Sequence, residues 1–177
     1  MNEPLAERVR RRVRDIPDFP TPGILFRDIT PVLADAALFG DVITHFRQRF
    51  AQARPDVLVA IESRGFIVGA PLAQALGVAF VPVRKPGKLP AETVRIDYQL
   101  EYGTDALEVH RDAIAPGQRV LLVDDVLATG GTAAGCIQLV RQLGGNVVHT
   151  GFLIEIAPLG GRARLHDLPV ESLLIYR

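Results

Sequence analysis

Residues Val120-Leu-Leu-Val-Asp-Asp-Val-Leu-Ala-Thr-Gly-Gly-Thr132 form the most informative run of the sequence. Its four leading apolar residues are typical of a strand buried on both faces of a parallel sheet. Asp124 and Asp125 stand where we expect this strand to end, and the loop from Ala128 to Thr132 leads into a helical pattern. Small residues before a helix let backbone amides approach an anion, and the helix dipole favours negative charge there. The run therefore predicts a sugar-phosphate site, with the aspartates accepting hydrogen bonds from sugar hydroxyls.

Two other phosphate-binding loops are excluded by their spacing. The chain has no G-x-x-x-x-G-K-[ST] motif, as a P-loop requires, and no G-x-G-x-x-G dinucleotide fingerprint. A plain strand-to-helix turn with two unrelated aspartates is the remaining alternative. It is disfavoured because adjacent carboxylates at a buried strand end repel each other and are difficult to solvate.

The composition fits one domain of neutral overall charge. A chain of 177 residues, 48% of them apolar, is long enough to bury a substantial core. Twenty basic and twenty acidic residues give zero net charge, so nothing global indicates nucleic-acid or membrane binding. No apolar run approaches the roughly 18 residues of a membrane span, and the polar start of the chain is unlike a signal segment. We therefore expect a cytoplasmic protein.

Short buried strands alternate with helical patterns along the chain. Helices are predicted over 5–14, 35–52, 67–76 and 132–143, strands over 57–61, 79–83, 120–123, 147–156 and 172–176, and a short helix or turn over 158–166. This alternation predicts an α/β fold with a mostly parallel, twisted sheet and helices on both faces. Residues 91–110 instead alternate around a turn near Gly103, which predicts an antiparallel hairpin.

Residues 16–33 contain too many prolines for a long helix or a central strand, yet they are too apolar for a linker. We expect a single domain over 1–177, in which 1–33 form a small N-terminal cap (hood) and 34–177 form the α/β core. Phe26 suits stacking on a flat heterocycle, although burial in the core is the commoner role of such a residue.

Charged residues follow other predicted strands as well. Glu62-Ser-Arg64 ends one strand, and Arg84-Lys85 with Lys88 ends another. Ligands of open α/β sheets bind beyond the carboxyl ends of the strands. Lys85 and Lys88 are the only lysines among twenty basic residues, which draws attention to their loop. A phosphate loop, an acid pair and two cationic loops together fit a ribose that carries a 5-phosphate and a 1-pyrophosphate.

Several segments extend this interpretation to a family. They are Phe19-Pro-Thr-Pro-Gly-Ile-Leu-Phe-Arg-Asp-Ile29, Glu62-Ser-Arg-Gly-Phe66, Arg84-Lys-Pro-Gly-Lys-Leu-Pro90, Leu100-Glu-Tyr-Gly103 and Val123 to Thr132. In this order they resemble the adenine-specific members of the type I phosphoribosyltransferase family over essentially the whole chain. The resemblance implies transfer of ribose-5-phosphate from phosphoribosyl pyrophosphate to adenine with Mg²⁺, giving AMP and pyrophosphate in purine salvage. It also implies a homodimer.

The resemblance further implies roles for individual residues. Ala128, Thr129, Gly130, Gly131 and Thr132 would bind the 5-phosphate, and Asp124 and Asp125 the ribose hydroxyls. Glu62, Ser63, Arg64, Arg84, Lys85 and Lys88 would attend the pyrophosphate, some of them across a subunit interface, with a cis peptide in the Glu62–Ser63 region. Base selection would fall to Leu25, Phe26, Arg27 and Leu127. No dedicated protein ligands are expected for Mg²⁺, which would bind mainly through the substrate.

The predicted hairpin is the candidate lid, because the cation that develops at ribose C1 must be kept from water. Glu101 is the best candidate for managing the purine proton, and Tyr102 for helping to close the site. Without the resemblance, both are equally well explained as exposed hairpin residues. Two other functions stay open: transfer to a different purine base, and a non-catalytic phosphoribosyl pyrophosphate sensor. The sensor is disfavoured because the sequence has no separate DNA-binding module.

Overall fold

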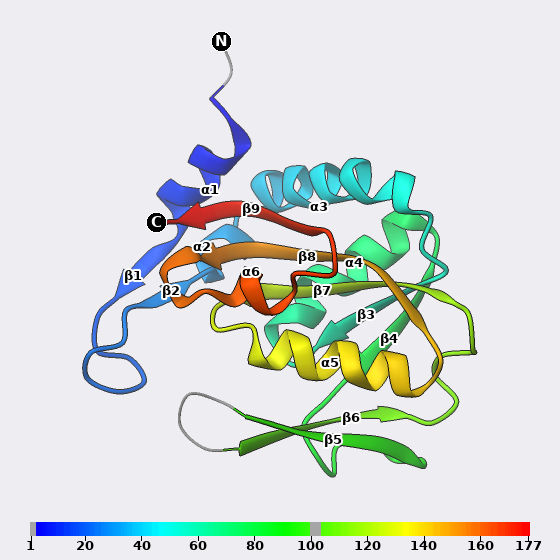
Figure 1. Cartoon of the computed structure of the whole chain (residues 1–177). Coiled ribbons are helices and arrows are strands. Elements are labelled where there is room, and N and C mark those ends of the chain that lie inside the picture. The colour runs from blue at the N-terminus through cyan, green and yellow to red at the C-terminus, as the bar shows by residue number, and fades with distance from the viewer. Residues whose placement is uncertain (1–2, 100–103) are drawn as a thin grey trace. The chain divides into compact units, whose positions relative to one another are not determined.

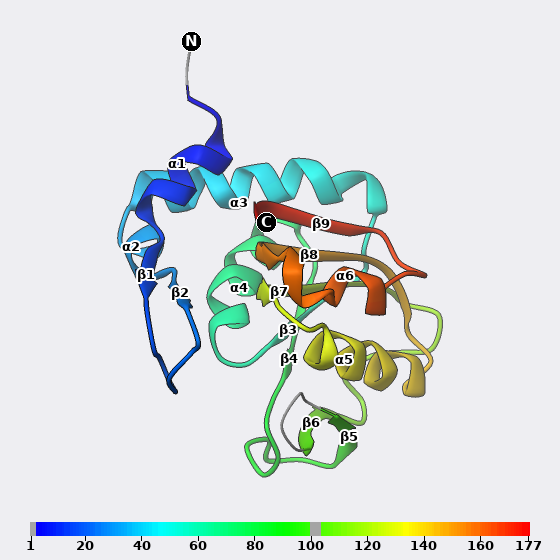
Figure 2. The same cartoon turned by 60° about the vertical axis from the view of Figure 1, so that its left-hand side comes forward.

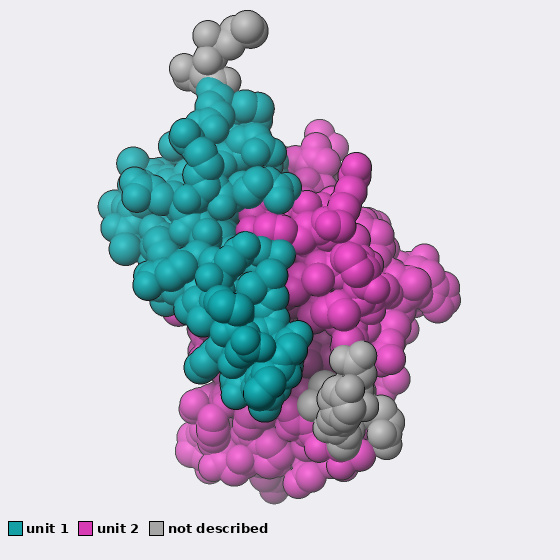
Figure 3. Space-filling model, turned by 90° about the vertical axis from the view of Figure 1, so that its left-hand side faces the viewer, with its two compact units in different colours: residues 1–45 teal, residues 46–177 magenta. Residues whose placement is uncertain are grey.

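The computed structural model describes residues 3–99 and 104–177. The chain forms two compact units, residues 1–45 and 46–177, shown in two colours in Figure 3. The first unit contains α1 (Leu5–Arg12), β1 (Arg14–Ile16), β2 (Phe26–Asp28), α2 (Thr30–Leu33) and most of α3 (Ala36–Phe50). The second contains β3 (Val57–Ile61), α4 (Arg64–Leu76), β4 (Ala79–Val83), β5 (Thr93–Gln99), β6 (Thr104–His110), β7 (Arg119–Leu127), α5 (Gly131–Gln142), β8 (Asn146–Ile156), α6 (Gly161–Arg164) and β9 (Val170–Tyr176).

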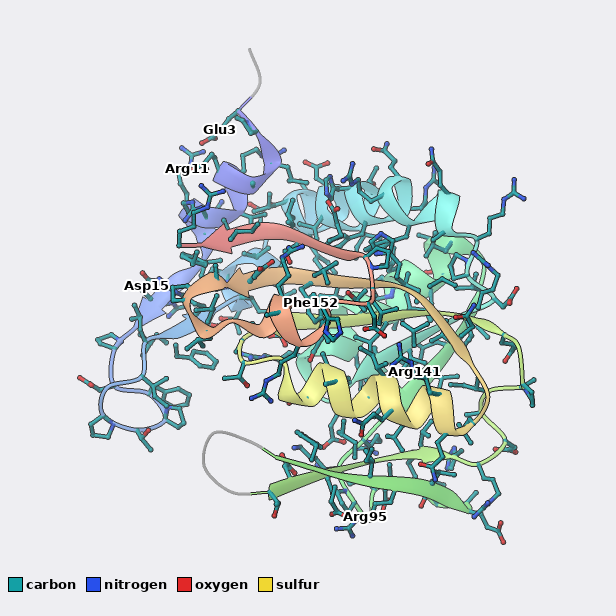
Figure 4. All side chains as sticks on the ribbon, in the orientation of Figure 1. Glu3, Arg11, Asp15, Arg95, Arg141 and Phe152 are labelled. Carbon is teal, nitrogen blue, oxygen red and sulfur yellow. The ribbon has the colours of Figure 1, made fainter. Side chains whose placement is uncertain are left out.

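Within the first unit, a short antiparallel ladder follows α1. The helix ends at Arg12, earlier than predicted, because Val13 is extended and the chain enters β1, which pairs with β2. Arg11 of α1 forms an ion pair with Glu3, and Figure 4 labels both residues. The ring of Phe19, in the loop between β1 and β2, meets the ring of Phe26 of β2 edge to face, with the ring centres 5.1 Å apart. The proline-rich segment thus forms the loop between two antiparallel strands, β1 and β2. The sequence did not predict that these strands pair.

The second unit is built on a five-stranded sheet in the order β4-β3-β7-β8-β9, and every pairing between these neighbours is parallel (Figure 1). All residues of β3 are buried, as expected for a central strand. Phe152 of β8, labelled in Figure 4, is also buried in this core. The predicted parallel α/β sheet is confirmed.

Helices cover both faces of this sheet. Leu58 and Ala60 of β3 lie against Gly69 of α4, whose missing side chain lets the helix approach closely. The alternate residues of β3 join the core cluster that includes Cys136 and Ile137 of α5. Because successive side chains of a strand point to opposite faces, α4 and α5 lie on opposite sides of the sheet. Helices on both faces were predicted, and the prediction is confirmed.

An antiparallel hairpin, β5 with β6, lies beyond α5 in both Figure 1 and Figure 2. Its Tyr98 packs against Gly135 of α5, where a β-carbon would come within 3.1 Å of the ring. The hairpin predicted over 91–110 is confirmed in its described part.

β7 is longer than the sequence indicated. We expected it to end at Asp124, but it runs to Leu127 and stays paired with β8 through Leu127↔Glu155. Its pairing with β3 stops at Val123. The two aspartates therefore sit on a part of β7 that extends past its pairing with β3.

Candidate active site

A pocket of about 420 Å³ lies at the carboxyl ends of β3, β4 and β7. It is lined by Ile61, Glu62, Ser63, Arg64, Lys85, Asp124, Asp125, Val126, Leu127, Ala128, Thr129, Gly130, Gly131, Thr132 and Ala133. Most residues predicted for the phosphate, ribose and pyrophosphate subsites thus share one cavity, which is where ligands of open α/β sheets bind.

Asp124 and Asp125 form a buried acid pair in this pocket. The amide of Asp125 donates to Oδ1 of Asp124 at 2.9 Å, and Nε of Arg64 lies 2.8 Å from Oδ2 of Asp125. Burial, reinforced by the charge of Asp125, raises the pKa of Asp124 well above that of an ordinary carboxyl. Burial also raises the pKa of Asp125, although Arg64 acts in the opposite direction. The pair is a concentrated set of acceptors inside the cavity.

The loop that follows the acid pair is shaped by glycine. Gly130 adopts φ +80° and caps the N-terminus of α5, a conformation that glycine takes without steric penalty. A β-carbon on Gly130 would lie 2.7 Å from the carbonyl oxygen of Gly161, in α6. The loop residues 128–132 line the pocket at the start of α5, and helix N-termini are well suited to binding anions. The loop is therefore in close backbone contact with Gly161.

Two cations converge on Glu62 beside the pocket. Arg84 donates to Oε2 of Glu62 at 2.8 Å, and Lys88 lies 2.5 Å from Oε1. Burial opposes the ionisation of Glu62, but these hydrogen bonds outweigh it and leave its pKa below the ordinary value. Neither Arg84 nor Lys88 lines the pocket itself. The peptide bond between Glu62 and Ser63 is cis, as the resemblance implied.

Lys85 reaches the pocket from the end of β4 and is held by the hairpin. Its ammonium contacts the carboxylate of Asp105 on β6 and the hydroxyl of Tyr98 on β5. Burial lowers the pKa of Lys85, and the two hydrogen bonds more than reverse this. The Tyr98 hydroxyl also lies 3.4 Å from Oγ1 of Thr132. This chain of contacts connects the hairpin to the phosphate loop.

The chain matches the family model described as "Phosphoribosyl transferase domain" over residues 31–171. An adenine phosphoribosyltransferase of Prochlorococcus marinus is 54% identical over 169 residues, covering 95% of this chain and 98% of the relative. A crystal structure of the same enzyme from Thermoanaerobacter pseudethanolicus has a TM-score of 0.95 and 51% identity, with 97% and 99% of the two chains covered. The chain belongs to the adenine phosphoribosyltransferases.

A further solved member of this family is the Saccharomyces cerevisiae enzyme, complexed with an imino-altritol bisphosphate and adenine. It is 42% identical to this chain, with a TM-score of 0.91 and coverage of 96% and 98%. In the present chain, residues 3–99 and 104–177 contain no helix that is both long and apolar enough to cross a membrane.

The remaining predicted site residues are those assigned to the base, to the purine proton and to the lid. Leu25, Phe26 and Arg27 belong to the first unit, whereas Leu127 lines the pocket and is buried. Glu101 and Tyr102 lie outside the described residues. Their assigned roles stay predictions.

Sequence reasoning missed three residues that contact the site. Tyr98 and Asp105 belong to the alternating pattern of the hairpin. Nothing in that pattern distinguishes the residues that contact Lys85, in the loop after β4. Gly161 carried a signal, the Gly160-Gly161 pair, but we interpreted that pair only as part of a turn. Each makes its contact through tertiary structure.

Proposed function

We propose that this chain transfers the 5-phosphoribosyl group of phosphoribosyl pyrophosphate to N9 of adenine, forming AMP and pyrophosphate. One observation carries the proposal for this member of the adenine phosphoribosyltransferases: residues 128–132, the acid pair, Arg64 and Lys85 line a single pocket. Purine salvage is the metabolic role of this reaction. We place the protein in the cytoplasm.

Each part of the pocket suits one part of the substrate. The amides of residues 128–132 would bind the 5-phosphate, because a helix N-terminus with small residues admits an anion closely. Asp124 and Asp125 would accept hydrogen bonds from the ribose hydroxyls. The pyrophosphate would meet Ser63, Arg64 and Lys85, with Arg84, Lys88 and Glu62 at the rim. One or more of these cations would serve the site of a partner subunit in a homodimer.

Mg²⁺ fits this pocket as an ion that arrives with the substrate. In residues 3–99 and 104–177, no group of three or more His, Cys, Asp or Glu side chains could hold a metal ion. Mg²⁺ commonly keeps its waters and binds through one or two carboxylates plus substrate phosphates. In this proposal Mg²⁺ would therefore bind mainly through the phosphates of the substrate, and the chain would supply no dedicated ligand set. When bound, Mg²⁺ would neutralise charge that develops on the departing pyrophosphate.

The protein's contribution to the chemistry is positioning and charge stabilisation. As pyrophosphate leaves, ribose C1 develops oxocarbenium character, much as in glycoside transfer. Holding the base and the ribose in line removes most of the entropic cost, and the cations stabilise the departing charge. Adenine must lose its N9 proton, and we assign that proton to Glu101. The hairpin with Tyr102 would act as the lid that keeps water from C1.

Base selection is proposed to fall to Leu25, Phe26, Arg27 and Leu127. Phe26 would stack on the purine, backbone groups of Leu25 and Arg27 would read its edge, and Leu127 would line the apolar side. In this proposal one phosphoribosyltransferase domain consists of an N-terminal cap segment, 1–33, and an α/β core, 34–177.

A pyrophosphate-release assay tests the function directly. The protein is supplied with phosphoribosyl pyrophosphate, Mg²⁺ and each purine base in turn. We expect release with adenine and little with hypoxanthine, guanine or xanthine. Release with another base alone would assign the chain to that base, and binding of phosphoribosyl pyrophosphate without release with any base would indicate a sensor.

The role of Glu101 has its own test. Glu101→Ala is expected to lower turnover far more than it weakens phosphoribosyl pyrophosphate binding, because the substrate's phosphates do not depend on this carboxylate. Unchanged turnover would remove Glu101 from the mechanism.

A further inference from the structure

The phosphate loop rests on the backbone of Gly161. A β-carbon on Gly161 would lie 2.2 Å from the carbonyl oxygen of Ala128 and 3.0 Å from the amide nitrogen of Gly130. No side chain fits between these two backbone segments. The position of residue 161 therefore constrains the position of the loop amides, and whatever holds residue 161 also holds the loop.

The next residue along the chain provides that hold. Arg162 donates from Nε to Oε1 of Glu155 at 2.9 Å and from Nη2 to Oε2 at 2.5 Å, which is a two-pronged pair. Ser172 of β9 donates to the same carboxylate at 2.6 Å, and Nη1 of Arg162 donates to the carbonyl of Val170 at 2.9 Å. Two-pronged guanidinium–carboxylate pairs fix orientation as well as distance.

Glu155 connects Arg162 to the strand that leads into the phosphate loop. It is 4% exposed, and it pairs in register with Leu127 of β7, the residue directly before the phosphate loop. Hydrogen bonds from Arg162 lower its pKa despite burial, so the carboxylate stays charged at neutral pH. The loop is thus enclosed between β7, which leads into it, and Gly161, which Arg162 ties to the neighbouring strand β8.

We propose that Arg162, through its pair with Glu155, is a positioning residue for the 5-phosphate of the substrate. It holds Gly161 against residues 128–130 and so keeps the loop amides aimed at the phosphate. The proposal rests on the proposed function for the identity of the ligand. The alternative is that the Arg162–Glu155 pair only anchors the C-terminal segment. In that case its loss would lower the stability of the fold without weakening one ligand more than another.

The two halves of the substrate separate these possibilities. Ribose 5-phosphate carries the group bound by the loop, and pyrophosphate carries the group bound by the cations. Binding of each to the folded protein is measured by calorimetry for Arg162→Ala, Arg162→Lys and the wild type. We expect Arg162→Ala to weaken ribose 5-phosphate binding about tenfold, as for loss of about 1.4 kcal/mol of binding free energy, and to change pyrophosphate binding less than twofold. Arg162→Lys should recover part of the loss.

Gly161→Ala is a second route to the same result and leaves the ion pair intact. Its added methyl group should push the loop away and weaken ribose 5-phosphate selectively, even if Arg162→Ala folds poorly. Arg164→Ala, at an exposed position two residues further along α6, is the matched control and should bind both ligands as the wild type does.

Steady-state kinetics give an independent readout. The KM for phosphoribosyl pyrophosphate should rise in Arg162→Ala while the KM for adenine stays within twofold. Equal weakening of both ligands in both variants, or unchanged ribose 5-phosphate binding, would overturn the proposal. Failure of the wild type to release pyrophosphate with adenine would count against the proposed function instead, since the calorimetric comparison does not require catalysis.

Discussion

Gly65, in the first turn of α4, faces the carboxylate of Asp124 so closely that a β-carbon there would lie 2.6 Å from Oδ1. It would also lie 3.4 Å from the Cα of Asp124. The acid pair can occupy the mouth of the pocket because residue 65 has no side chain. Glycine at position 65 thus lets the first turn of α4 lie directly against Asp124 of β7.

Gly65→Ala is predicted to impair substrate binding more than folding. The new methyl group must displace the buried Asp124 carboxylate, and overpacking of this kind costs about 1–3 kcal/mol. We expect the KM for phosphoribosyl pyrophosphate to rise by about tenfold or more, measured by initial rates at saturating adenine. Gly40→Ala in α3 is the control, since nothing lies within 4 Å of its β-carbon position. Replacing this helical glycine should raise stability by about 0.5–1 kcal/mol.

Asp124→Asn is predicted to stabilise the protein while it lowers activity. Burial and the charge of Asp125 raise the pKa of Asp124, so the folded state binds the Asp124 proton more tightly than the unfolded state does. Stability from this group is present at low pH and is lost as the pH rises from the ordinary carboxyl pKa through the raised one. Asparagine does not ionise and avoids the loss. We expect a higher unfolding free energy than that of the wild type at pH 8, with the difference shrinking towards zero near pH 4, in urea titrations at both pH values.

The neighbouring position provides the contrast. Asp125→Asn removes the ion pair with Arg64, so its gain at pH 8 should be smaller than that of Asp124→Asn. Both variants should lose about 10- to 100-fold in kcat/KM for phosphoribosyl pyrophosphate, the equivalent of one charged hydrogen bond. If Asp124→Asn is less stable than the wild type at pH 8, the ionised Asp124 carboxylate does not destabilise the fold as its burial indicates.

How much of this site was accessible from the sequence depends on the range of each interaction. The run from Val120 to Thr132 predicts a strand, an acid pair, a glycine loop and a helix because each of these is encoded by neighbours in the sequence. The predicted end of β7 was wrong, because the strand's end is set by its pairing with β8, which continues past Asp124. The polar residue Asp124 is typical of the end of a buried strand, but the hydrogen-bonded ladder with β8 keeps the chain extended beyond it.

Contacts between distant residues were the least predictable. Nothing in the sequence around Gly161 indicates that its backbone touches Ala128, and nothing around Asp105 indicates a lysine 20 positions away. The same holds for β1 and β2, whose pairing joins two short polar segments across a proline-rich loop. Their period-two pattern is too short to detect, and the ladder depends on the turn between them.

Glu62→Gln is predicted to tighten the binding of pyrophosphate. Glu62 now neutralises Arg84 and Lys88, and glutamine keeps its size without its charge. Removing one unit charge about 4 Å from an anion changes its energy by about 1 kcal/mol in water, or roughly fivefold in affinity. We expect a lower inhibition constant for pyrophosphate at low ionic strength, with the advantage fading as salt is added. Glu171→Gln removes a comparable partner from Arg49 elsewhere and should leave pyrophosphate inhibition unchanged. Weaker inhibition in Glu62→Gln would mean that Glu62 orients the cations.

Tyr98→Phe is predicted to loosen the connection between the hairpin and the phosphate loop. The substitution removes the hydroxyl that contacts Lys85, Asp105 and Thr132, but it keeps the ring that packs on Gly135. One or two modest hydrogen bonds are worth about 0.5–1.5 kcal/mol each. We therefore expect the KM for phosphoribosyl pyrophosphate to rise about two- to tenfold, with the midpoint of thermal unfolding lowered by a few degrees, about 2–4 °C for each kcal/mol lost. Asp97→Asn is the control on the same strand, because it breaks only an exposed pair with Arg95, which Figure 4 labels. A KM effect equal in the two variants would show that the hairpin acts through its general stability, whereas an effect confined to Tyr98→Phe assigns the connection to the hydroxyl.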